Sequence, residues 1–242
     1  MMPALCTSVV EAFRPDGSLM DLALPLVEEV DFCAIAGTLS RIARFNGVPD
    51  GVGYPVSQHC VLGTEALLNE GEDELTAALF LLHDAHEHFI GDHTRPFMEL
   101  LRAKLAARAG EKAGRELVGA IADIRQGWDE AIYAAAHLPP PTAWTNRQRS
   151  AVLAMDERML LAESRSLFGS QAGQNIHVAD RHRKARTPDF GARKNPLKPW
   201  GAMKAEEEFL KIFTRLRGQE TLIRARALHA AHAATFTPNR EG

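Results

Sequence analysis

The amino-acid sequence predicts an all-α protein, built as a single compact helical bundle with a C-terminal helical extension. Three observations support this fold class. Apolar residues recur at spacings of three and four through most of the chain, no segment shows a sustained run of alternating strand residues, and short turn sequences separate the periodic segments. Amphipathic helices joined in this way bury their apolar faces against one another.

The first part of the chain predicts an irregular lead-in followed by three helices. Residues 1–30 have no sustained period, apart from a short hairpin expected around Pro15 and Gly17. A first helix is expected from Asp31 until Asn46 and Gly47 end it, a second over 56–68, and a third from residue 75 until Gly91.

The second part continues in helices with two interruptions. Pro96 suits the first position of a helix that continues over 97–108, and helical spacing returns over 114–136, 146–168, 203–217 and 219–233. The segment LPPPT breaks the chain, and residues 169–202 are expected to form a long loop. We therefore expect a lead-in over 1–30, a functional core over 31–168, and a basic loop with C-terminal helices packed on that core over 169–242.

The composition indicates a cytoplasmic protein that acts on small molecules. The formal net charge of -3 provides no global basic field, so no specific nucleic-acid partner is expected. The three cysteines are widely spaced and include no C-x-x-C pair, which argues against a disulfide framework and against a thiolate zinc site. No window approaches the ~20 apolar residues of a membrane span, so no membrane partner is expected.

The segment LLHDAHEHFIGDHTRP, residues 81–96, carries the densest group of reactive side chains. His83 lies four residues after Leu79, which predicts an imidazole on the interior stripe of a helix. Glu87 follows His83 by four residues and Asp84 by three, so a helix would place these polar groups on neighbouring surface. Such a group is costly to bury without partners, although each residue alone is also compatible with a solvated helix end.

Two polar residues elsewhere add to this group. Asp156 lies at helical spacing between Val152 and Leu160, on the apolar face, so its carboxylate is expected to be buried. A buried carboxylate needs a metal, a cluster of donors or a cation, and a salt bridge to an arginine is the open alternative. His59 lies near a helix start, where a lone histidine is more often a cap or a core residue than a metal ligand.

The order of these residues matches a known pattern. The chain resembles the HD superfamily of metal-dependent phosphohydrolases over residues 31–168, and most closely the branch that includes the bacterial 5'-deoxynucleotidases. The matching positions, in chain order, are Arg44-Phe45, His59, His83-Asp84-x-x-Glu87, Gly91-Asp92 and Asp156.

This resemblance implies one divalent ion and a role for each residue around it. It implies that His59, His83, Asp84 and Asp156 bind the ion, with Mn, Co, Zn, Ni and Fe suited to these ligands and Mg less so. Glu87 would orient or deprotonate the attacking water, and Asp92 would handle a proton or bond the sugar hydroxyl. On the substrate side, Arg44 would hold the phosphate with Arg95 near it, and Phe45 would pack against sugar or base.

Two features depart from the family pattern. Met98 stands where related sequences have a lysine, so a phosphate contact is lost or supplied elsewhere. His86, His88 and His93 are not required by the pattern, and we expect core or surface roles for them rather than a second metal site. A third feature, the basic segment 181–200, is expected to be a solvated loop, with a lid that attracts polyphosphate or a nucleic-acid contact as the alternatives.

The expected activity is hydrolysis of a phosphate ester of a nucleotide, with a deoxynucleoside 5'-monophosphate as the first choice of substrate. Three alternatives remain open: a deoxynucleoside triphosphate triphosphohydrolase, a non-catalytic metal-containing nucleotide-binding protein, and an oxygenase with two irons. A homodimer is compatible with the apolar C-terminal helix around Phe209 and Phe213, which suits an interface as well as a core.

Overall fold

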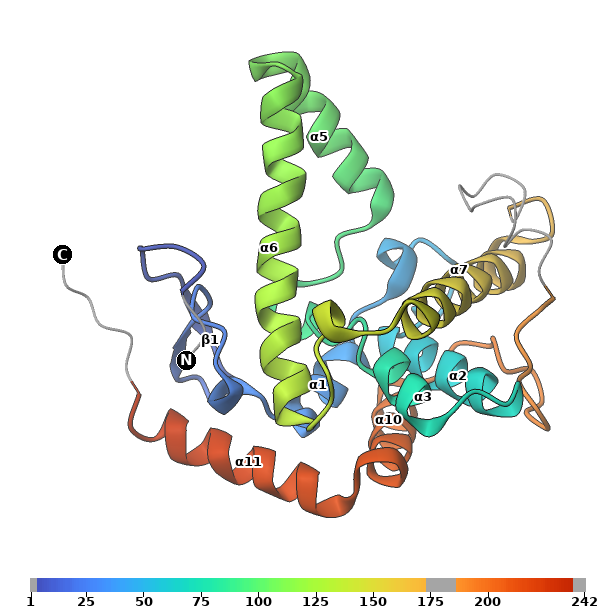
Figure 1. Cartoon of the computed structure of the whole chain (residues 1–242). Helices are drawn as coiled ribbons and strands as arrows, with labels where there is room; N and C mark the ends of the chain where they lie inside the picture. Colours follow the sequence, from blue (N-terminus) through green and yellow to red (C-terminus); the bar gives the residue numbers. More distant parts are fainter. Residues whose placement is uncertain (1–3, 173–185, 237–242) are drawn as a thin grey trace.

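The computed structural model describes residues 4–172 and 186–236, and the all-α fold class is confirmed (Figure 1). Within the described residues, no helix combines the length and the apolar character needed to cross a membrane. The helices are α1 (Phe32–Leu39), α2 (Val56–Asn69), α3 (Glu74–Leu81), α4 (Glu87–Ile90), α5 (Arg95–Ala109), α6 (Glu111–Ala135), α7 (Asn146–Phe168), α10 (Ala202–Arg217) and α11 (Gln219–Ala233). Short 3-10 turns are η1 (Val27–Glu29), η2 (Arg44–Gly47) and η3 (Pro141–Ala143).

The expected N-terminal hairpin is confirmed. Strands β1 (Glu11–Phe13) and β2 (Leu19–Asp21) pair antiparallel. Next to the hairpin, the guanidinium of Arg14 forms a buried ion pair of 2.6 Å with Glu29 of η1, and His232 Nε2 of α11 lies 3.0 Å from the same carboxylate. One buried carboxylate therefore links the hairpin to the last described helix.

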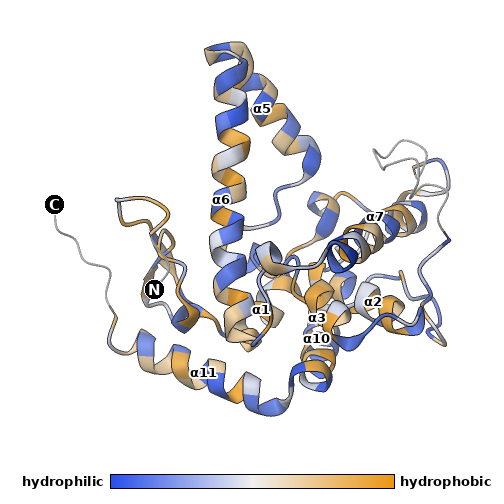
Figure 2. Ribbon diagram, in the orientation of Figure 1, coloured by the Kyte–Doolittle hydropathy of each residue, from blue (hydrophilic) through white to orange (hydrophobic). Residues whose placement is uncertain are grey.

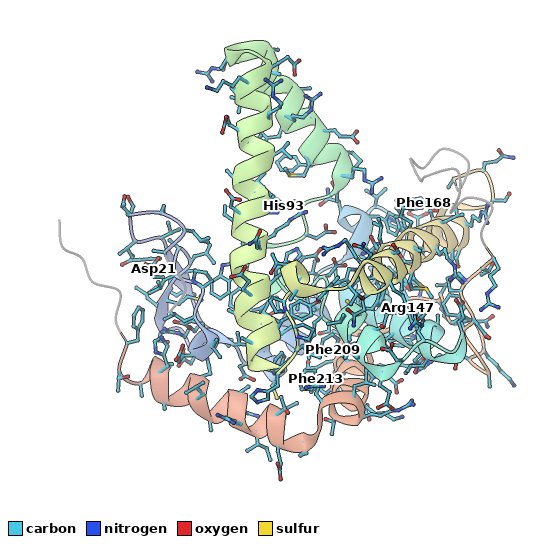
Figure 3. All side chains as sticks on the ribbon, viewed as in Figure 1. Asp21, His93, Arg147, Phe168, Phe209 and Phe213 are labelled. Carbon is cyan, nitrogen blue, oxygen red and sulfur yellow. The ribbon has the colours of Figure 1, made fainter. Side chains whose placement is uncertain are left out.

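The core lies where α1, α2, α3 and α10 meet. Phe209 and Phe213 extend from α10 into this region (Figure 3), and the rings of Phe213 and Phe32 are 4.3 Å apart. In Figure 2 the inner helices α1 and α3 are largely hydrophobic, whereas the outer part of α5 and α6 alternates between polar and apolar residues. The apolar face of α10 that suited a dimer interface is thus covered by the chain's own core.

Helices α5 and α6 form an arm that stands out from the body (Figure 1). Helix α5 buries no residue, but the inner end of α6 enters the core through Trp128 and Tyr133. The Tyr133 hydroxyl donates a 2.7 Å hydrogen bond to the Leu79 carbonyl, and the Trp128 ring stacks on Phe89. The arm therefore supports both helices that flank His83 and Asp84.

Two predicted helices are shorter than expected. The first ends at Leu39, and the backbone of Arg44 instead bonds to the Tyr54 carbonyl at 2.8 Å. The third is interrupted after Leu81 by a turn whose hydrogen bonds span three residues, such as Ala85 to Leu82. Both interruptions lie beside residues whose polar side chains are directed to a common point. A straight amphipathic helix could not direct these side chains there.

The basic segment also differs from the expectation of a solvated loop. Residues 181–185 lie outside the described residues, but Arg193 forms ion pairs with Glu65 of α2, at 2.5 Å, and with Glu208 of α10. The Gln58 amide donates to the carbonyls of Pro196 and Lys198 at 2.9 and 3.0 Å. From residue 186 onward the segment is therefore held against α2 and α10 by specific bonds.

Gly63 of α2 provides a test of the packing that supports the site. A Cβ atom at Gly63 would lie 2.2 Å from Cε1 of Phe80, a fully buried ring that packs on both His59 and His83. We expect Gly63→Ala to lower the free energy of unfolding by about 1–3 kcal/mol, measured by denaturant titration. Gly119→Ala on α6, where a Cβ meets nothing within 4 Å, should be neutral or stabilising, and equal losses in both variants would contradict this packing role.

Candidate metal centre

The structure brings the four predicted metal ligands together from separate segments. His59 comes from α2, His83 and Asp84 from the turn between α3 and α4, and Asp156 from α7. His59 Nε2 lies 3.4 Å from His83 Nε2 and 3.3 Å from Asp156 Oδ1, and His83 Nε2 lies 3.3 Å from Asp84 Oδ2. Distances of this size let the four side chains reach one shared point.

Both imidazole rings are oriented by hydrogen bonds at Nδ1. His83 Nδ1 lies 2.6 Å from the Phe80 carbonyl, and His59 Nδ1 lies 2.8 Å from Glu163 Oε1. Because a carbonyl or carboxylate oxygen only accepts, each Nδ1 carries a proton, and each Nε2 atom is left to face the shared point. Two Nε2 atoms and two carboxylates directed at one point fit a single divalent ion.

The electrostatics of this cluster also favour positive charge at the shared point. Burial lowers the pKa of His83, but Asp84 and a hydrogen bond to Asp156 outweigh it and raise the pKa well above the usual value. The partial burial of Asp156 raises its pKa, but hydrogen bonds to His59 and His83 hold the pKa well below its usual range. Protons and a metal ion would therefore compete for the same place.

Glu163 belongs to the candidate centre, although the sequence analysis did not predict it. It is fully buried, and besides orienting His59 it accepts a 3.0 Å hydrogen bond from Arg44 Nε. It follows Asp156 by seven residues on α7, two turns along the same side of the helix, so its spacing was a usable signal. A carboxylate behind a ligating histidine fixes the tautomer and raises the basicity of the ring.

Arg44 lies at the edge of the centre. Its Nη1 atom is 3.4 Å from Asp84 Oδ2, its guanidinium lies 5.9 Å from the Phe45 ring centroid, and its side chain is 13% exposed. Phe45 and Asn46 both have left-handed backbone angles, with φ of 57° and 55°. The predicted phosphate and sugar contacts of Arg44 and Phe45 stay predictions, but Arg44 is already bonded to two carboxylates in the site.

Glu87 and Asp92 border the predicted ligands. Glu87 is buried, its Oε2 atom has no hydrogen-bond partner, and burial together with the charges of Asp84 and Asp92 raises its pKa to about 9. Burial raises the pKa of Asp92 too, and the charge of Asp84 adds to this effect. A buried carboxyl group with a raised pKa and a free oxygen is suited to transfer a proton.

The structure corrects the expected burial of Asp156. Its side chain is 34% exposed rather than buried, because the buried stripe of α7 runs through Val152, Met155 and Met159. Its ion-pair partners in the structure are His59 and His83, instead of the arginine that was the alternative.

The remaining predicted residues lie around the centre in other roles. Arg95 begins α5 and lines a cleft beside the arm, together with Met98. His86 Nδ1 bonds to Asp129 at 2.9 Å, and the rings of His88 and His93 pack on Phe89 and Phe97. Among the described residues, none of these three histidines belongs to a group that could hold a metal, so a two-iron centre gains no support.

Comparisons with known proteins do not indicate a function for this chain. No family model matches the chain. An uncharacterized protein of Rhodobacter capsulatus is 36% identical over 83 residues, which cover 33% of this chain and 42% of the relative. The chain thus matches less than half of that relative's length.

Replacing Glu163 tests its role behind His59. We expect Glu163→Gln to weaken metal binding by about 10- to 100-fold, because the amide neither holds the His59 ring as firmly nor raises its basicity. Isothermal titration of metal-stripped protein with Mn²⁺ or Zn²⁺ measures this. Glu207→Gln on the exposed side of α10 is the matched control and should leave the affinity unchanged; an unchanged affinity in Glu163→Gln would show that the hydrogen bond does not support the ligand.

The pKa directions also predict how pH affects metal binding. The raised pKa values of His59 and His83 mean that both rings retain protons to higher pH than usual, and these protons must leave when a metal binds. The apparent affinity is therefore expected to rise from pH 6 to pH 8, with proton release visible as a dependence of the binding enthalpy on the buffer. An affinity that does not change over this interval would contradict the assignment of both imidazoles as ligands.

Proposed function

We propose that the chain is a metal-dependent phosphohydrolase of the HD type that cleaves a phosphate ester of a nucleotide, with a deoxynucleoside 5'-monophosphate as the simplest substrate. The observation that carries this proposal is the convergence of two Nε2 atoms and two carboxylates beside the unbonded oxygen of Glu87. The three cysteines are free thiols, which fits a reducing cytoplasm.

Each residue around the centre would have its own role in hydrolysis. A divalent ion bound by His59, His83, Asp84 and Asp156 would lower the pKa of a water and polarise a phosphoryl oxygen. Glu87 would orient that water, and it would accept the proton of the water once the positive charge of the bound ion has restored its carboxylate form.

The substrate side of the centre is built on Arg44. Its guanidinium, fixed by Glu163 and Asp84, would offer its remaining N–H groups to the phosphate. Asp92 would bond a sugar hydroxyl or return a proton to the leaving oxygen.

The backbone conformation directly after Arg44 supports a functional role for this part of the site. Left-handed angles at two successive residues with side chains, Phe45 and Asn46, cost of order 1–3 kcal/mol each. Such strain is usually kept where it positions a functional group. Here it turns the chain directly after Arg44 and brings Phe45 into edge-to-face contact with Phe168 at the end of α7.

The decisive test is nucleotide hydrolysis by protein that has been stripped of metal and reloaded with Mn, Co, Mg or Zn. We expect metal-dependent release of phosphate and nucleoside from deoxynucleoside monophosphates. Glu87→Gln should retain the metal and lose at least about 100-fold in kcat, whereas Asp84→Ala should lose both metal and turnover.

Other outcomes of this assay distinguish the alternatives. Triphosphate as the product from deoxynucleoside triphosphates would identify the triphosphohydrolase alternative. Bound metal with no turnover on any nucleotide would contradict the enzyme proposal and favour a nucleotide-binding role.

A further inference from the structure

A free thiol lies directly beside the predicted metal ligands. Cys60 follows His59 on α2, and its side chain is fully buried. Its Sγ atom lies within 4.8 Å of a donor atom of His83 and within the same distance of a donor atom of Asp84. A cysteine, a histidine and an aspartate thus meet at one place, and together they form a donor set that can hold a divalent ion.

The spacing of these three atoms is close to what one ion requires. A zinc ion binds sulfur at ~2.3 Å and imidazole nitrogen at ~2.1 Å, so two such donors are at most about 4.4 Å apart. Separations within 4.8 Å therefore need a shift of no more than a few tenths of an ångström. His83 needs no change of orientation, because the bond from Nδ1 to the Phe80 carbonyl already leaves Nε2 to face the centre.

The surroundings of the thiol distinguish it from an ordinary core cysteine. A buried free cysteine usually behaves as a small hydrophobic residue. Cys60 adjoins the apolar core, but it also interacts electrostatically with His83, Asp84 and Glu87, which all belong to the candidate centre. The thiol therefore lies at the boundary between the core and the centre, with its sulfur within reach of an ion.

We propose that Cys60 is a thiolate ligand of the metal centre, on the side of His83 and Asp84, and that the centre therefore selects a thiophilic ion such as Zn²⁺ over Mn²⁺ or Mg²⁺. On binding, the thiol releases its proton to the buffer and its sulfur bonds to the ion. His59 and Asp156 do not belong to the group of Cys60, so the thiolate occupies a coordination position of its own. This inference rests on the metal centre of the proposed function but not on the substrate.

The proposed ligand set differs from the kind of thiolate site that the sequence argues against. The wide spacing of the cysteines argues against a site built from several thiolates. One thiolate next to a histidine and a carboxylate needs no C-x-x-C pair. The fold instead brings the three side chains together from α2 and from the turn after α3.

The absorption spectrum of cobalt-loaded protein tests this assignment without any turnover. Full-length protein stripped of metal is titrated with Co²⁺ in oxygen-free buffer. We expect a thiolate-to-cobalt charge-transfer band in the near ultraviolet that saturates at an equimolar amount of Co²⁺. Cys60→Ser should lose this band but retain the visible bands of the bound ion. Cys33→Ser, which changes a half-buried thiol on α1 outside the group, should retain both.

The same pair of variants measures the effect on metal selection. The ratio of the Zn²⁺ affinity to the Mn²⁺ affinity, from calorimetric titrations, should fall at least about tenfold in Cys60→Ser and stay unchanged in Cys33→Ser. X-ray absorption by zinc-loaded wild-type protein needs no variant, so it keeps the test valid if Cys60→Ser fails to fold. This measurement should show a sulfur neighbour at ~2.3 Å from the ion.

The two proposals fail in different ways. Bound zinc without a sulfur neighbour, or a charge-transfer band that persists in Cys60→Ser, would overturn the ligand assignment even if the loaded protein hydrolyses nucleotides. A sulfur-bound ion without turnover of any nucleotide would support the ligand assignment and reject the hydrolase. Protein that binds no divalent ion would contradict both.

Discussion

The hydrogen bonds at the Nδ1 atoms of His59 and His83 orient both imidazoles of the candidate metal centre. Each bond keeps a proton on Nδ1 and directs Nε2 toward one point, so the two imidazoles are oriented as a pair of donors would be for one ion. Glu163 and the Phe80 carbonyl are therefore as much a part of the centre as its ligands. Glu163 also accepts a hydrogen bond from Arg44, so the same buried carboxylate positions a predicted metal ligand and the predicted phosphate contact.

Several elements of the fold hold the Phe80 carbonyl and the residues around it in place. The Phe80 carbonyl accepts from both the backbone N–H and the Nδ1 of His83 because α3 ends at Leu81, and the turn that follows directs Asp84 toward the same point. The inner end of α6 stabilises this arrangement through Tyr133, which bonds to the Leu79 carbonyl. Farther out, residues of α5 and α6 line a cleft beside the arm.

Periodicity predicted the fold class and most helices because apolar spacing is a local property that burial reinforces. The hairpin, α7 and the two C-terminal helices follow the expected bounds closely. Periodicity failed at α1 and α3, where other hydrogen bonds replace those of a continued helix: the Arg44 backbone N–H bonds to the Tyr54 carbonyl, and His83 bonds to the Phe80 carbonyl. The four predicted ligands do converge. Glu163 was missed because its partners His59 and Arg44 lie 104 and 119 positions away in the sequence.

The location of the ion is the central claim, and anomalous X-ray diffraction tests it most directly. Crystals grown with Mn²⁺ or Zn²⁺ would be measured on both sides of the absorption edge of the metal. We predict one strong peak about 2.0–2.3 Å from the Nε2 atoms of His59 and His83 and within bonding distance of Asp84 and Asp156. A peak elsewhere, or none at these four side chains, would contradict a metal centre built on the two oriented imidazoles.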